Sequence, residues 1–140
     1  MPDQDLAICS LQGVGLGLRH TYYPDFLENP QPVDWLEVHA ENYFGNGGYD
    51  LHVLETLRQQ YPLSVHGVGL GIGSAAPLSI AHLKKLKVLC ERIDAAAVSE
   101  HLCWNAADGV YANELLPLPM RSDLLGWLEG RVSQVQDVLG

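Results

Sequence analysis

The sequence has few basic residues and no basic cluster. Its 140 residues include 8 lysines and arginines against 17 aspartates and glutamates, which gives a formal net charge of -9. Proteins that bind the backbone of nucleic acids need clustered positive charge to replace the counterions. We therefore expect no nucleic-acid partner.

Long apolar runs and cysteines are also scarce. No apolar stretch approaches the roughly 20 residues that span a bilayer, and the acidic start at residues 1–5 is unlike a signal peptide. The three cysteines, Cys9, Cys90 and Cys103, show no CxxC spacing, so we expect neither a disulfide framework nor a zinc knuckle. These absences predict a cytoplasmic protein with reduced thiols and no membrane partner.

Four short apolar runs each carry a histidine and polar neighbours near their ends. They span residues 14–20, 35–42, 63–67 and 97–101, and loops or helix-like stretches lie between them. Strands that alternate with helices predict a parallel sheet with right-handed crossovers. The fold class expected is α/β, a (β/α) TIM-barrel type, in which the chemistry lies at the C-terminal ends of the strands.

The segments between and after these runs give the remaining elements. Helical patterns cover residues 21–27, 54–61 and 80–93, and a last helix is expected to begin near Ser122, a good N-cap residue. The stretch between the fourth run and that helix is expected to be a long loop. Residues 67–74 are rich in glycine but lack the GxGxxG spacing of a dinucleotide site, so we interpret them as a tight active-site loop.

The length of the chain suits one domain but not a complete barrel. A full eight-stranded barrel needs about 250 residues, whereas about four βα units are present here. Half a barrel would leave two edge strands open. We therefore expect residues 1–140 to be the N-terminal half of a longer barrel domain, or to self-associate through the open edges. The final Gly140 falls where a fifth strand would begin.

His66 and His101 are the strongest candidates for metal ligands. Each ends a predicted strand, and two imidazoles on neighbouring parallel strands lie close enough to share a metal. A histidine hydrogen-bonded to a loop would be the structural alternative for either residue. Because adjacent strand residues point to opposite faces, only one of Glu100 and His101 faces the interior, and we favour His101. His52 and His82 fall within helices and are expected at the surface.

The first two strands supply candidate catalytic residues. Glu37, His39 and Glu41 share one strand face by the period of two, and ionisable groups are costly in a plain core. If that face looks inward they are ligands or acid–base groups, and if it looks outward they form a solvated rim. Glu41 and Asn42 are the stronger pair. Arg19 either holds a substrate carboxylate or braces Glu37 and Glu41 through an ion pair.

Taken together, five motifs resemble the DUF692 family, also called UPF0276. They are GLGLR at 15–19, EVHAENYF at 37–44, SVHGVGL at 64–70, SEHLCW at 99–104 and LLPLP at 115–119. The family contains multinuclear non-haem iron oxygenases that modify cysteine in ribosomally made peptides, such as the methanobactin-biosynthesis oxygenase. The resemblance covers nearly the whole chain, and it implies a barrel related to xylose isomerase.

The resemblance also implies a cofactor, ligands and partners. Two or three iron ions would lie at the mouth of the complete barrel, with zinc or another divalent metal as the alternative, and His66 and His101 match the family's histidine ligands. Glu41, Asn42 and Arg19 would line or support the site. The family's next ligand is the glutamate of a Glu-Asn-Pro motif on a fifth strand, which this chain does not contain. A cysteine-containing peptide would be the substrate, and a partner protein would deliver it.

Two other functions fit the same residues. A divalent-metal isomerase or hydrolase of the xylose-isomerase type would use the same end of the barrel. A non-catalytic, truncated barrel that assembles with another chain would need no complete site, since fold alone does not fix function.

Overall fold

The computed structural model describes residues 11–140, so the interpretations of residues 1–5 and of Cys9 concern a segment outside the described residues. The strands are β1 (Gly15–Gly17), β2 (Trp35–His39), β3 (Leu63–Gly67), β4 (Ala97–Glu100), β5 (Trp104–Ala107) and β6 (Val110–Leu116). The α-helices are α1 (Tyr23–Glu28), α2 (Tyr49–Leu57), α3 (Ile80–Ile93) and α4 (Leu125–Leu139). Three 3₁₀ turns, η1 (His20–Tyr22), η2 (Ala40–Tyr43) and η3 (Ser122–Leu124), complete the elements.

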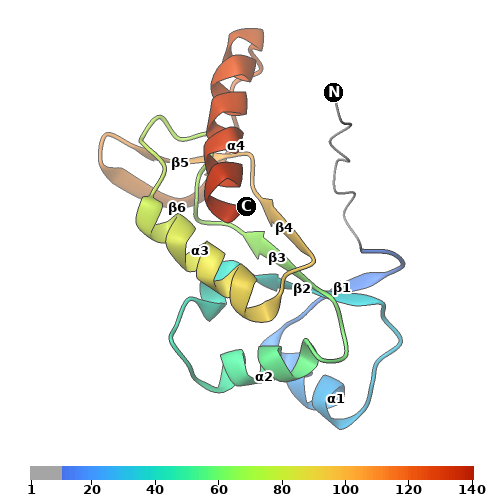
Figure 1. The fold of residues 1–140 in the computed structure, drawn as a ribbon. Helices are drawn as coiled ribbons and strands as arrows, with labels where there is room; N and C mark the ends of the chain where they lie inside the picture. Colours follow the sequence, from blue (N-terminus) through green and yellow to red (C-terminus); the bar gives the residue numbers. More distant parts are fainter. Residues whose placement is uncertain (1–10) are drawn as a thin grey trace.

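The first four strands form one parallel sheet in the order β1-β2-β3-β4 (Figure 1). Each strand is joined to the next through a helix, which gives the alternation that the sequence predicts. Sequential parallel strands connected in this way are half of a TIM barrel. The expected fold class is therefore confirmed.

One face of this sheet is covered by helices and forms the core. Leu36 and Val38 of β2 lie beside Leu63 and Val65 of β3, and all four side chains are fully buried. Helix α3 adds a stripe of Leu83, Leu86, Leu89 and Ile93, at the helical spacing that the sequence shows. Its first turn is capped by the Ser79 hydroxyl, which accepts a hydrogen bond from the His82 N–H.

The opposite face of the sheet carries the alternate residues of the same strands. On β2 and β3 these are Glu37 and His39, and Ser64 and His66. Polar side chains on this face, with apolar side chains on the other, fix the register of the sheet, because a slip by one residue would exchange the two sets.

The segment after β4 differs from the expected long loop. Strands β5 and β6 form an antiparallel hairpin that turns at Asp108 and Gly109, with Ala107 paired to Val110. Both turn residues have positive φ, 50° and 77°, as a two-residue hairpin turn requires. Asp-Gly is the sequence signal of such a turn, so the loop prediction was wrong.

The last helical segment starts where the sequence indicates, at Ser122, but through the 3₁₀ turn η3. Helix α4 follows at Leu125 without a side-chain cap, so the expected capping role of Ser122 was wrong. Across residues 11–140, no helix combines the length and apolarity needed to cross a membrane.

Candidate functional site

Three histidines lie side by side at the C-terminal ends of neighbouring strands. His39 ends β2 and is in register with His66 on β3, and His101 directly follows β4. The ring centroids of His39 and His66 are 5.8 Å apart, and those of His66 and His101 are 4.6 Å apart. These three residues, called the imidazole row below, bring together the two expected ligands and add His39.

Neighbouring side chains orient the imidazole row. His66 Nδ1 shares a 2.8 Å hydrogen bond with the hydroxyl of Ser99, which leaves Nε2 of that ring for another partner. A hydrogen bond to the second ring nitrogen is the usual way in which a metal-binding histidine is held in place. Burial lowers the pKa of His39, and the positive charge of Arg19 lowers it further. Both effects favour the neutral imidazole, the form that ligates metals.

Arg19 and Asn42 lie at a cavity beside this row. The cavity measures about 470 Å³ and is lined by Leu18, Arg19, His20, Tyr23, Asn42, Tyr43, Tyr49 and Asp50. Arg19 Nη1 lies 3.4 Å from His39 Nε2. Glu37 instead accepts a 3.1 Å hydrogen bond from Ser64. Among the described residues, the ion pairs do not join Arg19 to Glu37 or Glu41.

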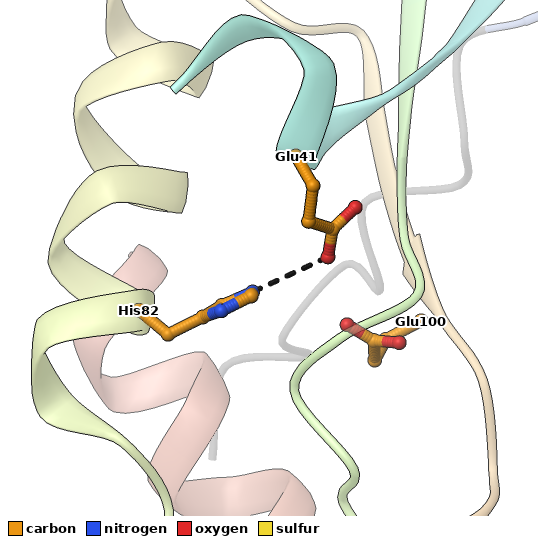
Figure 2. Close-up of side chains that lie close together, drawn as sticks. All are labelled: Glu41, His82 and Glu100. Carbon is orange, nitrogen blue, oxygen red and sulfur yellow. Dashed lines mark ion pairs between the residues drawn. The ribbon is translucent and has the colours of Figure 1, made fainter. Parts of the chain in front are cut away.

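Glu41 belongs to a second group of ligand-type side chains, with His82 and Glu100 (Figure 2). One ligand atom from each residue lies within 4.8 Å of the other two. Glu41 comes from η2, His82 from the first turn of α3 and Glu100 from the end of β4. We call these three residues the Glu–His–Glu cluster.

The Glu–His–Glu cluster lies on the opposite face of the sheet from the imidazole row. Glu100 is in register with Gly67, whereas Ser99 is in register with His66. Alternation along a strand therefore turns Glu100 toward the face on which α3 packs, while His101 lies against His66. This is the separation of Glu100 from His101 that the sequence predicts.

The glycine-rich loop after β3 holds both carboxylates of the cluster. Oε1 of Glu41 accepts hydrogen bonds of 2.9 and 2.8 Å from the backbone N–H groups of Val68 and Gly69. Oε2 of Glu100 accepts a 3.4 Å bond from the Leu70 N–H, and Oε1 accepts a 2.8 Å bond from the His101 N–H. The loop is thus a carboxylate-binding turn at the end of the sheet.

The two carboxylates differ strongly in acidity. Burial acts to raise the pKa of Glu41, but His82 and the N–H groups of Val68 and Gly69 outweigh it and lower the pKa to about 2. Burial raises the pKa of Glu100 to about 7, and the negative charge of Glu41 acts in the same direction. At neutral pH, Glu41 is therefore ionised, whereas Glu100 beside it is partly protonated.

His82 is the residue that sequence reasoning missed. It was expected at the surface, but its side chain is only 19% exposed, and Nε2 lies 3.4 Å from Oε1 of Glu41. One signal was available, because helices of a βα barrel begin close to the C-terminal ends of the strands they follow. A histidine in the first turn of α3 was therefore a candidate for the site. His52 is exposed, as expected.

The two cysteines that the structure describes, Cys90 and Cys103, lack the features of a reactive thiol. Cys103 is buried, and burial raises its pKa. Burial raises the pKa of Cys90 from 9.0 to about 11. The thiolate is the reactive form, so neither residue is set up as a nucleophile.

In a Cys9→Ser variant the remaining thiols are those of Cys90 and Cys103, and we expect both to be alkylated very slowly near pH 8. A pKa of about 11 in place of 9.0 lowers the thiolate fraction of Cys90 about 100-fold. The rate of iodoacetamide labelling, followed by mass spectrometry, should rise with pH and should increase about 100-fold when the chain is unfolded in urea. Equal rates in folded and unfolded chains would contradict this assignment.

The fold and the site define a class of protein. A parallel βα half barrel with imidazoles and carboxylates at the C-terminal ends of its strands is typical of the TIM-barrel class, which carries its sites at those ends. The family model described as "RiPP precursor modification enzyme MbnB/TglH/ChrH" matches residues 13–140. The chain belongs to this family, the DUF692 or UPF0276 proteins.

Several curated relatives support the same assignment. The chain is 44% identical to a UPF0276 protein of Acaryochloris marina over 135 residues, which are 96% of this chain and 49% of that protein. It is 45% identical to a UPF0276 protein of Vibrio parahaemolyticus over 127 residues, which are 90% of this chain and 44% of that protein. The chain thus spans about half the length of the curated relatives it matches.

Proposed function

We propose that this chain forms part of an iron-dependent oxygenase that oxidises cysteine in a ribosomally made peptide. The imidazole row is the observation that carries the proposal, since it places His66 and His101 side by side at the end of the sheet. Family membership supports a peptide substrate. A cytoplasmic location and a partner protein that delivers the peptide belong to the same proposal.

The side chains of the imidazole row fit iron. Imidazole nitrogen is a good ligand for divalent iron, and Ser99 orients the His66 ring so that Nε2 remains for the metal. His66 and His101 would hold the ion, with His39 beside them. Iron, when bound, supplies a redox-active Lewis acid for oxidation of a cysteine thiol.

The remaining residues of the site would bind and orient the peptide. Arg19 and Asn42 line the cavity next to His39, where a guanidinium donates to carboxylate or carbonyl oxygens and an amide pairs with peptide groups. Glu41 lies on the helical face of the sheet and would keep the loop at residues 68–69 in position through its two backbone hydrogen bonds.

The first test is iron content. The 140-residue chain is loaded anaerobically with ferrous iron and analysed by elemental analysis, together with the His66→Ala/His101→Ala variant. We expect the double variant to bind one iron fewer per chain, because it loses two imidazole ligands. His52→Ala is the matched control, since this histidine is exposed on α2. Unchanged iron in the double variant would overturn the assignment of the ligands.

The second test addresses the substrate. The iron-loaded chain is expected to bind a cysteine-containing peptide more tightly than the same peptide with serine, because thiolate is a soft ligand for the metal. Arg19→Gln should weaken binding of both peptides to a similar degree. Equal affinity for the cysteine and serine peptides would count against cysteine as the reacting group.

A further inference from the structure

We propose that Glu41, His82 and Glu100 form a second divalent-metal site, separate from the imidazole row. Two carboxylates and one imidazole place ligand atoms within 4.8 Å of one another. The three residues come from η2, α3 and β4, so the fold, and not one local motif, brings them together (Figure 2).

Two buried atoms in the cluster point to a missing ligand. Oε2 of Glu41 and Nε2 of His82 are both shielded from solvent, and no described residue supplies either with a hydrogen-bond partner. His82 Nε2 is 3.4 Å from Glu41 Oε1, within ion-pair range but without hydrogen-bond geometry. Buried polar atoms in native proteins are nearly always satisfied, and one cation between these atoms would satisfy both.

The charge of the cluster also favours a cation. Two carboxyl groups share a half-buried space with one imidazole, and the ion pairs of the described residues bring neither lysine nor arginine to Glu41 or Glu100. Like charges held close together in a partly buried space oppose each other's ionisation. A divalent ion would offset that repulsion and allow both carboxylates to ligate.

Glycines make the space for this site. A Cβ on Gly67 would lie 2.3 Å from Oε2 of Glu100, and one on Gly69 would lie 3.1 Å from both Oε1 of Glu41 and Cε1 of His82. A side chain at Gly67 would therefore displace the Glu100 carboxylate, and one at Gly69 would crowd Glu41 and His82. The N–H groups of Val68 and Gly69 donate to Oε1 of Glu41, so that Oε2 remains for the ion.

The ligand set indicates the kind of metal. One imidazole with two carboxylates suits zinc, manganese or ferrous iron, whereas magnesium and calcium prefer oxygen ligands alone. The cluster and the imidazole row lie on opposite faces of the sheet, so the sheet would separate this ion from one bound at the imidazole row. A metal behind the strand ends would fix η2, the loop at residues 67–70 and the start of α3 relative to one another.

Zinc titration tests the proposal, because zinc is redox-silent and suits both kinds of ligand. The chelator-treated chain is titrated calorimetrically with zinc chloride, and bound zinc is counted by elemental analysis. The background is the His39→Ala/His66→Ala/His101→Ala variant, which removes the imidazole row. We expect it to bind one zinc per chain, and a further His82→Ala change should weaken binding at least 100-fold. A further His52→Ala change should leave the affinity unaltered.

The results separate this site from the imidazole row. Circular dichroism first checks that the variants are folded. If the triple variant does not fold, the wild-type chain is compared with His82→Gln, which should bind one zinc fewer. A folded triple variant that binds no zinc, or zinc affinity unaffected by loss of His82, would overturn the second site. Zinc lost through His82 but not through His66 and His101 would instead support this site and contradict the proposed imidazole-row ligands.

Discussion

Replacing Arg131 with methionine is expected to lower the free energy of unfolding by about 3 kcal/mol. Arg131 lies on α4 and is buried, with no carboxylate partner among residues 11–140. Its guanidinium donates hydrogen bonds to three backbone carbonyls, those of Ile72 (3.1 Å), Ser74 (2.8 Å) and Ala76 (2.6 Å). Methionine fills similar volume but leaves these carbonyls without donors. Hydrogen bonds from a charged group contribute about 1.5–3 kcal/mol each, net of hydration, and relief of the desolvation cost of the buried charge offsets part of their loss.

The physical reason lies in the geometry of the guanidinium. Its planar fork presents several donors at once, which a lysine ammonium does not reproduce. Arg131→Lys is therefore expected to recover only part of the loss. Because the segment held by Arg131 continues the loop at residues 67–70, the change should also loosen the turn that binds Glu41 and Glu100.

Urea unfolding followed by circular dichroism measures the effect of Arg131→Met. The matched control is Arg121→Met, because Arg121 is exposed and, within residues 11–140, forms its one ion pair with the exposed Asp123. Such surface pairs contribute about 0–1 kcal/mol, so the control should unfold almost like the parent chain. Similar losses for the two variants would mean that the carbonyl contacts of Arg131 contribute little to stability.

Gly67→Ala is expected to destabilise the chain by about 2 kcal/mol. Gly67 ends β3 and does not have positive φ, so backbone strain is not the reason. The added Cβ would lie 2.3 Å from Oε2 of Glu100, and the three nearest heavy atoms all belong to the Glu100 side chain, whose carboxylate is held by the His101 and Leu70 N–H groups. Overpacking of this kind costs about 1–3 kcal/mol.

A double-mutant cycle identifies the collision as the cause. In a Glu100→Ala background the space beside Gly67 is open, so Gly67→Ala should cost less than about 0.5 kcal/mol there. Gly126→Ala on α4 is the control, since a Cβ there meets nothing within 4 Å and alanine favours the helix by up to about 1 kcal/mol. An equal cost of Gly67→Ala in both backgrounds would rule out Glu100 as the obstacle.

Much of the sheet follows from local sequence patterns. Apolar and polar residues alternate along β2 and β3, and this period of two places Val38 and Val65 in the core and His39 and His66 on the other face. Because the strands are parallel, their C-terminal ends meet at one edge. The neighbouring positions of His66 and His101 were predictable for that reason. The hairpin of β5 and β6 also had its signal in the Asp108-Gly109 pair.

The Glu–His–Glu cluster, by contrast, was decided by tertiary structure. Glu41 and His82 are far apart in the sequence and belong to different βα units, and no periodicity within a unit relates them. They meet because α3 packs across the helical face of the sheet and presents its first turn to the loop after β3. Patterns of alternation assign a residue to a face, whereas contacts between units depend on how helices cross the sheet. The sequence by itself therefore determined the strands and the imidazoles at their ends, and packing alone determined which carboxylates meet His82.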